Sequence, residues 1–289
     1  MASKTVPYVS TVAELRKIVA RWRKAGERVA VIPTMGALHE GHLELVRRAQ
    51  RKAERTVTSI FVNPAQFAPT EDFDKYPRTF EDDLAKLKGV GCDLVWAPRK
   101  DEMYPGGFAT RIVPAGAAEG LETDFRPHFF GGVATVCTKL FTQTGADFAM
   151  FGEKDYQQLC VIRQIVRDLN LPLEIVGVPT VREPDGLAMS SRNRYLSADQ
   201  RARAITIHHV ITKVADAAGK GRGLEKAIED GHAALTTAGF RQIDYVAVRD
   251  AETLKEWSKK AGRPGRVLAA AWLGETRLID NIAVPAAKR

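Results

Sequence analysis

The stretch that decides the fold is Val29–Gln50, VAVIPTMGALHEGHLELVRRAQ. Its first four residues are apolar, which is typical of a strand buried on both faces of a sheet. We expect Pro33 to end this strand, because proline cannot donate a hydrogen bond to a sheet ladder. From about Gly41, apolar residues recur at helical spacing. The sequence therefore predicts a buried strand, a short loop and then a helix.

Two histidines, His39 and His42, lie where this loop becomes the helix. A helix N-terminus presents free backbone N–H groups and the positive end of the helix dipole, so it favours an anion. Gly36 and Gly41 lack side chains and would let a phosphate approach the backbone closely. Zinc is disfavoured, because zinc proteases space their ligands as His-Glu-x-x-His and no third ligand is nearby. The pattern indicates a phosphate site, and the plain alternative is two histidines that decorate a helix start.

Strand and helix patterns alternate around this stretch. Besides the central strand, apolar or β-branched segments predict strands at 56–62, 92–97, 148–151 and 173–178. Helical patterns lie before or between the strands, at 12–24, 79–88, 132–144 and 156–169, and a capping box at Thr11–Glu14 opens the first of them. This alternation predicts an α/β domain, with a parallel sheet that has helices on both sides.

The segment Arg182–Gly186, REPDG, is the strongest break in the chain, because it is charged and turn-forming. We place a domain boundary there, between residues 1–181 and 182–289. The second part predicts a helix from a capping box at Ser197–Gln200 to about Ala217, a helix at 224–237, and strands at 243–248, 266–272 and 279–284. These elements predict a small α+β domain with an antiparallel sheet. His208 and His209 lie in its first helix without an evident partner and are expected to be structural or solvent-facing.

The composition is that of a globular enzyme, since 45% of the 289 residues are hydrophobic and 27% are charged. No apolar run approaches the roughly 20 residues that span a bilayer, and the opening MASKTVPYVS lacks the apolar core of a signal peptide. We therefore expect a cytoplasmic protein with no membrane partner. Cys92, Cys137 and Cys160 are far apart in apolar surroundings and are expected in the core rather than in disulfides.

The formal net charge of +8 is unevenly spread, because residues 182–289 hold 19 Lys and Arg against 13 Asp and Glu. A basic surface can bind nucleic acid, or it can cover a polyanionic small molecule such as ATP. The sequence has no interleaved aromatic and basic residues and no RNA-binding motif. We therefore expect a polyanionic small substrate and no nucleic-acid partner.

The segment Thr34–His42, TMGALHEGH, resembles the HxGH signature of the nucleotidyltransferase superfamily, in the form typical of the pantothenate synthetase (pantoate–β-alanine ligase) family. Five further motifs resemble the same family and extend over most of the first two-thirds of the chain. The resemblance implies a Rossmann-like fold of the HIGH type with a smaller C-terminal lid domain. It also implies that pantoate and β-alanine are joined through a pantoyl adenylate, with ATP and Mg²⁺ required, AMP and pyrophosphate released, and a homodimer as the assembly.

The resemblance assigns ATP to several of these motifs. The residues concerned are Met35, Gly36, His39, Gly41 and His42 in the first motif, Gly152, Glu153, Lys154 and Asp155 after the fourth strand, Val178 and Val181 at the end of the fifth, and Met189, Ser190, Ser191 and Arg192 beyond the boundary. His39, His42 and Lys154 are the expected catalytic residues, which would stabilise charge on the phosphate oxygens. Hydroxyls and an arginine on a mobile turn can wrap a triphosphate, so we expect Ser190–Arg192 to become ordered with ATP.

The resemblance assigns pantoate and β-alanine to Met35, Asn63, Gln66 and Gln158. Gln66 lies in FVNPAQF, after the second strand, and an amide can both donate to and accept from a hydroxy acid. Asp82 and Asp83, in YPRTFEDDL, are the candidates for the Mg²⁺ site, because Mg²⁺ on ATP takes one or two protein carboxylates. Acids near a helix N-terminus are also common for dipole reasons alone.

The chain departs from the family at Arg126–Val133, RPHFFGGV, where the usual pattern is RPGHFxGV. His128 replaces the glycine, Phe129 replaces the histidine, and Gly131 occupies the variable position. No role is transferred to His128, and the role of Arg126 is left open between contact with substrate and shaping of a neighbouring wall.

Two other functions remain open at this point. A cytidylyltransferase would use the same HxGH motif with CTP and a phosphate-bearing nucleophile, but it would not need the paired amides of Gln66 and Gln158. An RNA-binding module similar to part of a tRNA synthetase would use the basic C-terminal part, but no tRNA-binding domain is visible.

Overall fold

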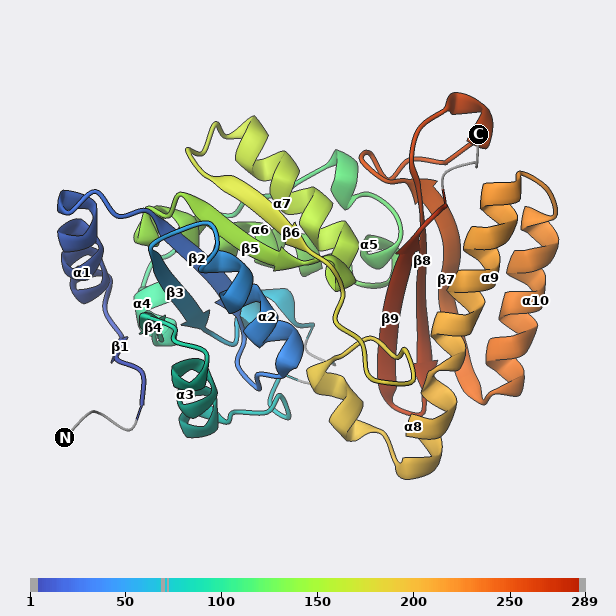
Figure 1. Ribbon diagram of the computed structural model, residues 1–289, viewed down its shortest axis with the longest axis horizontal. Helices are drawn as coiled ribbons and strands as arrows, with labels where there is room; N and C mark the ends of the chain where they lie inside the picture. The colour runs from blue at the N-terminus through green and yellow to red at the C-terminus, as the bar shows by residue number, and fades with distance from the viewer. Residues whose placement is uncertain (1–4, 69–70, 72, 286–289) are drawn as a thin grey trace.

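The computed structural model describes residues 5–68, 71 and 73–285, and two sheets organise this chain (Figure 1). The larger sheet has six strands in the order β1-β4-β3-β2-β5-β6, and all neighbours are parallel. Its strands are β1 (Tyr8–Val9), β2 (Val29–Thr34), β3 (Arg55–Ile60), β4 (Leu94–Trp96), β5 (Phe148–Gly152) and β6 (Glu174–Val178). The predicted α/β domain with a parallel sheet is confirmed, with β1 as an additional edge strand that the sequence did not indicate.

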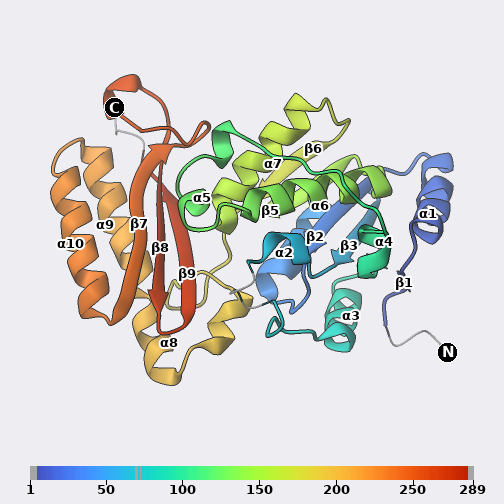
Figure 2. The ribbon, with the colours of Figure 1, turned by 180° about the vertical axis from the view of Figure 1, so that it is seen from behind.

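Helices cover both faces of this sheet (Figures 1 and 2). The helices of this part of the chain are α1 (Val12–Lys24), α2 (Glu40–Ala49), α3 (Phe80–Gly89), α4 (Lys100–Met103), α5 (Glu122–Phe125), α6 (Phe129–Thr144) and α7 (Tyr156–Asp168), of which α5 lies toward the smaller sheet (Figure 1). Val29 and Val31 of β2 pack into one apolar cluster with α1, α6 and α7, whereas Ala30 and Ile32 pack into another with α2 and α3. Because successive side chains of a strand point to opposite faces, a continuous apolar run fills both clusters.

Pro33 does not end β2, which continues to Thr34. Along a parallel strand, successive residues turn their backbone groups to opposite neighbours. The Val29 carbonyl accepts from the Asp147 N–H on the β5 side. Pro33 lies four residues further along the strand, so its backbone nitrogen and carbonyl also face the β5 side. β2 and β5 pair only at Ala30 and Val31, so no ladder hydrogen bond is required of Pro33. The expected strand end was wrong because β2 has a free edge at that point.

The smaller sheet is antiparallel, in the order β7-β8-β9, and α9 and α10 cover one of its faces (Figure 1). Its elements are β7 (Phe240–Asp250), β8 (Gly265–Leu273), β9 (Thr276–Ala283), α8 (Ala198–Ala204), α9 (Thr206–Lys220) and α10 (Leu224–Thr237). On the other face, Leu268 and Tyr245 pack into the cluster of α6 and α7, so the two sheets share a core. The α+β arrangement of the C-terminal part is confirmed.

The helix predicted from Ala198 to about Ala217 is divided at Ile205 into α8 and α9. The expected capping box of Ser197 and Gln200 does open α8. Arg201 of α8 forms an ion pair with Asp185, whereas the apolar face of α9 is buried against the smaller sheet. The two segments pack on different partners, and periodicity alone does not reveal such a division.

Five short 3-10 helices complete the described chain: η1 (Pro64–Gln66), η2 (Gly116–Ala118), η3 (Glu153–Asp155), η4 (Ser191–Tyr195) and η5 (Lys259–Ala261). Cys92, Cys137 and Cys160 are buried and unpaired, as expected. Within the described ranges, none of the helices has the length and apolar character needed to cross a membrane.

Candidate active site

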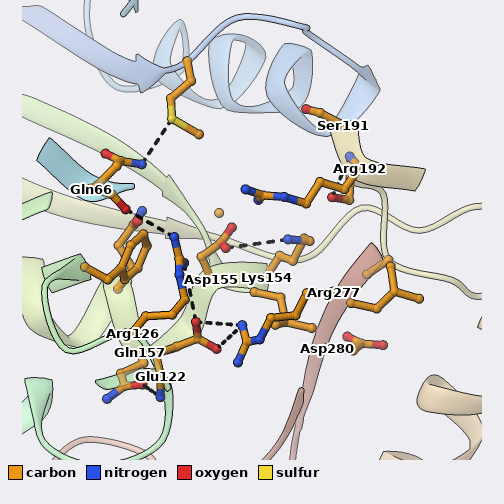
Figure 3. A pocket seen from close by; sticks show the side chains of 18 of the residues that line it. Gln66, Glu122, Arg126, Lys154, Asp155, Gln157, Ser191, Arg192, Arg277 and Asp280 are labelled. Carbon is orange, nitrogen blue, oxygen red and sulfur yellow. Dashed lines mark hydrogen bonds and ion pairs between the residues drawn. The ribbon is translucent and has the colours of Figure 1, made fainter. Parts of the chain in front are cut away.

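A cleft of about 1310 Å³ lies between the two sheets, at the carboxyl ends of β2, β3, β5 and β6. The strand order reverses beside β2, because β3 and β4 follow on one side and β5 and β6 on the other. Open α/β sheets bind ligands at such a switch point. The predicted site residues that line the cleft are Met35, His39, Gly41, His42, Asn63, Gln66, Gly152, Lys154, Asp155, Gln158, Val181, Met189, Ser190, Ser191 and Arg192. Figure 3 shows how several of these side chains converge.

His39 and His42 form the two halves of a capping box at the start of α2. His39 is the N-cap, and its Nδ1 accepts a hydrogen bond from the Gly41 N–H at 3.2 Å. The Nδ1 of His42 accepts in turn from the His39 N–H at 3.3 Å. A neutral imidazole whose Nδ1 accepts must carry its proton on Nε2. The hydrogen-bond network thus assigns an Nε2–H donor to each ring, and the ring centroids lie 4.1 Å apart.

Both imidazoles are neutral at physiological pH. Burial, His42 and Lys154 lower the pKa of His39 from 6.5 to about 2. Burial, Lys154 and Lys86 lower the pKa of His42 from 6.5 to about 4. A positive ring is disfavoured here because it would lie beside Lys154 and at the positive end of the α2 dipole. The two histidines therefore offer neutral hydrogen-bond donors to an anion.

The loop between β2 and α2 is held by Asp83 of α3, whose side chain is completely buried. Its Oδ2 accepts from the Ala37 N–H at 2.9 Å, and its Oδ1 accepts from the Leu38 N–H at 2.8 Å. Gly36 and Ala37 have positive φ angles of 84° and 52°, which only glycine adopts without strain. Gly36 therefore shapes the turn and does not line the cleft, in contrast to its predicted ATP contact.

The predicted magnesium ligands do not fit that role. Both oxygens of Asp83 accept backbone hydrogen bonds, and Asp82 is exposed on α3. Neither residue lines the cleft. In the part of the chain that the structure describes, no three His, Cys, Asp or Glu side chains group so as to hold a metal ion. We therefore withdraw Asp82 and Asp83 as magnesium ligands, because the carboxylate of Asp83 is used to position the histidine loop.

Gln66 and Gln158 both line the cleft. The Gln66 Nε2 lies 3.1 Å from the Met35 Sδ, and its Oε1 accepts from the Asn63 Nδ2 at 3.1 Å. Asn63 is 1% exposed, and its amide is fully occupied by Gln66, Ala65, Tyr104 and Gly132. Asn63 therefore orients Gln66 and has no group left for a substrate. The amide of Gln158 has no hydrogen-bond partner among the described residues.

Lys154 lies in η3, directly after β5. Its side chain is 19% exposed, and its Nζ lies 3.6 Å from the Asp155 Oδ1. A compact ammonium held this loosely can meet a phosphate in the cleft. Glu153, which was also predicted for ATP, does not line the cleft. Its Oε2 instead accepts from the Arg266 Nη2 at 3.0 Å, and its predicted contact with ATP stays a prediction.

The turn Ser190–Arg192 faces the histidine loop. Ser190 caps η4 by accepting from the Arg192 N–H at 3.2 Å, and the Ser191 Oγ donates to the Ala37 carbonyl at 3.3 Å. Val181 lines the cleft beside this turn. The side chain of Val178 does not, because it is buried in the apolar cluster beneath α2, so its predicted contact with ATP stays a prediction.

A cluster of charges that the sequence did not indicate joins α5 to the smaller sheet at the far end of the cleft (Figure 3). The Arg277 Nη1 donates to both oxygens of Glu122 at 2.8 Å, and its Nε donates to Asp244 at 2.7 Å. The Tyr245 hydroxyl donates to Glu122 at 2.8 Å. These contacts connect α5 with β7 and β9. Arg277 and Glu122 are 155 residues apart in sequence, so no local sequence pattern could have predicted their contact.

The segment that departs from the family pattern lies beside this cluster. Arg126 donates to both oxygens of Glu71 at 2.9 and 2.6 Å, and its guanidinium lies 3.9 Å over the Phe129 ring. The His128 Nε2 lies 3.6 Å from Glu71. Arg126 also donates to the Gln66 carbonyl at 3.3 Å. Phe129 and Glu71 thus fix the side chain of Arg126, which forms part of the cleft wall next to Gln66.

A parallel sheet whose switch point presents two imidazole donors at a helix N-terminus is the arrangement expected of an HxGH nucleotidyltransferase. A lysine after β5 and a hydroxyl-bearing turn opposite complete a surface suited to phosphate chemistry. This fold and cleft define the class of enzyme.

Comparison with known proteins gives the particular family. The family model of pantoate-beta-alanine ligase matches residues 7–283. A pantothenate synthetase of Mesorhizobium japonicum is 57% identical over 279 residues, covering 96% of this chain and 98% of that protein. One of Caulobacter vibrioides is 56% identical over 278 residues, with the same coverage. The chain therefore belongs to the pantoate-beta-alanine ligase family, and it is an ATP-using ligase.

Comparison with solved structures gives the same family. The crystal structure of a pantothenate synthetase from Thermus thermophilus has a TM-score of 0.87 and 48% identity, covering 96% of this chain and 99% of that one. The ligase from Francisella tularensis, complexed with beta-gamma ATP and beta-alanine, has a TM-score of 0.81 and 30% identity, covering 96% and 97%. The predicted Rossmann-like fold and family are confirmed.

Proposed function

We propose that this chain joins pantoate to β-alanine in two steps, through a pantoyl adenylate, and releases AMP and pyrophosphate. The observation that carries the proposal is that two neutral imidazole donors and two amide side chains face one cleft at the sheet's switch point. The imidazoles suit a phosphate, and the amides suit a hydroxy acid. The family supports a ligase over the cytidylyltransferase alternative, and the Francisella relative was crystallised with beta-gamma ATP and beta-alanine.

The first step forms the adenylate. A carboxylate oxygen of pantoate attacks the α-phosphorus of ATP, a new P–O bond forms, and the bond from that phosphorus to the β-phosphate oxygen breaks. Pyrophosphate leaves with the bonding electrons. The carboxylate needs no general base because it is already ionised near neutral pH. Such a displacement depends mainly on positioning and on stabilisation of charge at the phosphate oxygens.

His39, His42 and Lys154 would stabilise that charge. The Nε2–H groups of the two histidines donate to the α-phosphate oxygens, and Lys154 supplies the positive charge that the neutral rings lack. The first turn of α2, which includes Gly41, adds backbone N–H groups. The turn Ser190–Arg192 would hold the outer phosphates and release them as pyrophosphate.

The second step consumes β-alanine. Gln66 and Gln158 hold the hydroxyl groups of the pantoyl moiety, with Met35 packed against it. The neutral amine of β-alanine attacks the acyl carbon, a C–N bond forms, the C–O bond to AMP breaks, and the amine loses a proton to water. Asn63 contributes by holding Gln66 in place.

Mg²⁺ enters with ATP in this proposal, and Asp155 is the protein carboxylate that fits it. Asp155 lines the cleft, its side chain is 48% exposed, and its ion pair with Lys154 is 3.6 Å long. Mg²⁺ on a nucleotide keeps most of its waters and uses only one or two protein carboxylates. When bound, the ion shields the charge of the triphosphate.

Residues 182–289 would act as a lid over residues 1–181. A closed lid protects an acyl adenylate from water. Two contacts support this, because Ser191 reaches the Ala37 carbonyl of the histidine loop and Arg277 reaches Glu122. We expect a protease to cut the Ser190–Arg192 turn more slowly when ATP is bound. A homodimer and a cytoplasmic location remain predictions.

Incubation of the protein with ATP, Mg²⁺, pantoate and β-alanine tests the reaction. Pyrophosphate should appear with ATP and pantoate alone, and AMP and pantothenate should appear once β-alanine is added. Pyrophosphate release that does not need pantoate would contradict the two-step scheme. So would AMP release that is as fast without β-alanine as with it. Turnover of CTP in place of ATP would favour the cytidylyltransferase alternative.

A further inference from the structure

Two buried polar residues of β9, Asp280 and Asn281, have no place in the reaction described above. Asp280 is 2% exposed and Asn281 is 3% exposed. Among the described residues β9 pairs only with β8, so it is an edge strand of the smaller sheet. Because neighbouring side chains on a strand point to opposite faces, these two residues reach different elements of the molecule.

Asp280 holds the hairpin that leads into the turn Ser190–Arg192. Its two oxygens accept from the Arg182 Nη1 and Nη2 at 2.7 and 2.9 Å. Arg182 also donates to the Gly186 carbonyl at 3.0 Å and forms an antiparallel bridge with Ala188. Ser190 follows this hairpin directly. The bidentate ion pair therefore fixes where the turn begins.

A second group also contacts Asp280. The His208 Nδ1 lies 3.4 Å from its Oδ2, so the expectation that this histidine lacks a partner was wrong. Burial alone would raise the pKa of Asp280, but the nearby His208 and the hydrogen bonds from Arg182 hold it below the usual value of 3.8. The carboxylate is thus ionised when it binds Arg182.

Asn281 holds the loop that carries Lys154. Its Nδ2 donates to the Glu153 carbonyl at 2.9 Å and to the Lys154 carbonyl at 2.8 Å. Its Oδ1 accepts from the Arg266 Nε at 2.7 Å, and Arg266 itself donates to the Glu153 side chain at 3.0 Å. The amide thus uses both its donor and its acceptor groups to fix the backbone of η3.

The two loops follow neighbouring strands of the larger sheet, β5 and β6, and both must meet one triphosphate in the proposed reaction. We infer that β9 sets the distance between them, with Asp280 and Asn281 as positioning residues for adenylate formation. Neither side chain touches substrate in this account. Each acts through the loop that it holds, and a displacement of about 1 Å at such a site can cost on the order of 10²-fold in rate.

The test compares these residues with a matched buried carboxylate of the same sheet. Asp250 of β7 is 5% exposed and forms an ion pair with Arg263 at 2.6 Å, but it lies outside the cleft. We compare Asp280→Asn and Asn281→Ala with the control Asp250→Asn. Asn281→Asp is a second variant at that position, which keeps the acceptor for Arg266 and loses the donors to the two carbonyls.

The measurements are the kcat and the ATP KM of pantoate-dependent pyrophosphate release, together with the Tm of each variant. Asp280→Asn and Asn281→Ala should lower kcat by about 10- to 100-fold. Asp250→Asn should leave kcat within about twofold of wild type, even if its Tm falls by as much as the Tm of the two β9 variants. If the β9 variants lose only Tm and keep the kcat of the control, they are merely structural and the inference is wrong. If Asn281→Ala does not fold, Asn281→Asp decides in the same way.

The inference rests on the proposed function, but the two can fail separately. If the wild-type protein releases no pyrophosphate from ATP and pantoate, the proposed function fails. The role of β9 is then decided by calorimetric titration with ATP and Mg²⁺, where the two β9 variants, but not Asp250→Asn, should bind at least about tenfold more weakly. Where the wild type is active, the kcat comparison decides; where it is not, equal ATP affinity in all three variants would overturn the inference.

Discussion

The two walls of the cleft that face the proposed triphosphate are built in different ways. The first, Met35–His42, is one continuous stretch in which a strand passes into a helix and the histidines cap that helix themselves. The second, Ser190–Arg192, is a turn whose position depends on Arg182 and Asp280, which are 98 residues apart in sequence. The first wall is therefore preorganised mainly by its own strand, helix and caps, with Asp83 of α3 as one outside anchor, and the second is assembled by more distant contacts.

We expect the two walls to have different roles in the reaction. Chemistry that needs fixed donors belongs on the rigid wall, where the imidazoles are oriented before any ligand arrives. Ordering and release of a triphosphate belong on the assembled wall, where a few contacts can form and break. Substitutions on the first wall should therefore reduce kcat, and substitutions within the Ser190–Arg192 turn that leave its backbone in place should mainly change the ATP KM.

The largest effect is expected for His42→Ala, which removes an Nε2–H donor from the rigid wall. Adenylate formation should slow by about 10²- to 10³-fold, the usual cost of one lost donor at a developing charge. Loss of its capping bond should cost only about 1 kcal/mol of stability. Single-turnover pyrophosphate release measures the effect, and His209→Ala, an exposed histidine of α9, is the control. A near-normal rate in His42→Ala would remove this histidine from the mechanism.

The next effect is expected for Asp83→Ala, which leaves the Ala37 and Leu38 N–H groups without their acceptors. Unsatisfied buried donors should lower the free energy of unfolding by about 3 kcal/mol, and kcat should fall because the histidine loop moves. The exposed neighbour Asp82→Asn should change stability by less than about 0.5 kcal/mol. Urea unfolding and a Mg²⁺ titration of activity distinguish the roles. A higher Mg²⁺ requirement with unchanged stability would restore Asp83 as a metal ligand.

A smaller effect follows from the lowered pKa values of the two histidines. Below pH 6.5 the unfolded chain binds a proton at each imidazole while the folded protein does not, so the stability that is present above pH 6.5 is lost as the pH falls. At about pH 5 the loss is about 2 kcal/mol for each ring. Urea unfolding at about pH 5 and about pH 7.5 should show that His42→Gln removes its share of this dependence. An identical pH dependence in wild type and variant would contradict the assignment.

The smallest effect is expected on the assembled wall, for Ser191→Ala. This change removes the hydrogen bond to the Ala37 carbonyl, worth about 1 kcal/mol, so the ATP KM should rise by about fivefold. The kcat should change little, because the donors of the rigid wall are untouched. Steady-state kinetics with Ser258→Ala, an exposed serine far along the chain, as control measures this. A large fall in kcat with an unchanged KM would show that the two walls do not divide the work as described.

The sequence was informative wherever neighbouring residues determine the structure. The bounds of α10 and the capping boxes at Thr11 and Ser197 were predicted correctly, because helix periodicity and caps are local. The strand, loop and helix around His39 were predicted for the same reason. Gln66, Gln158 and Lys154 lie in motifs that follow parallel strands, and such strands end at one edge of their sheet. The sequence therefore predicted that these three residues share one cleft, as they do.

The sequence was uninformative where a side chain chooses between near and distant partners. Glu153 and Lys154 are adjacent, but Arg266 of the other sheet draws Glu153 out of the cleft. Asp83 is indistinguishable by motif from an acid that binds metal, until the fold brings the Ala37 N–H to it from 46 residues away. The positioning role of Asp280 and Asn281 carries no local signal, because Arg182, Glu153 and Lys154, which they hold, lie 98 to 128 residues earlier in the chain.

The most direct measurement of the central claim is a crystal structure of the protein with pantoate and a non-hydrolysable ATP analogue. This account predicts an α-phosphate oxygen within hydrogen-bonding distance of the Nε2 atoms of His39 and His42, and pantoate held between Gln66 and Gln158. A triphosphate bound away from the N-terminus of α2, or one that meets neither imidazole, would contradict it.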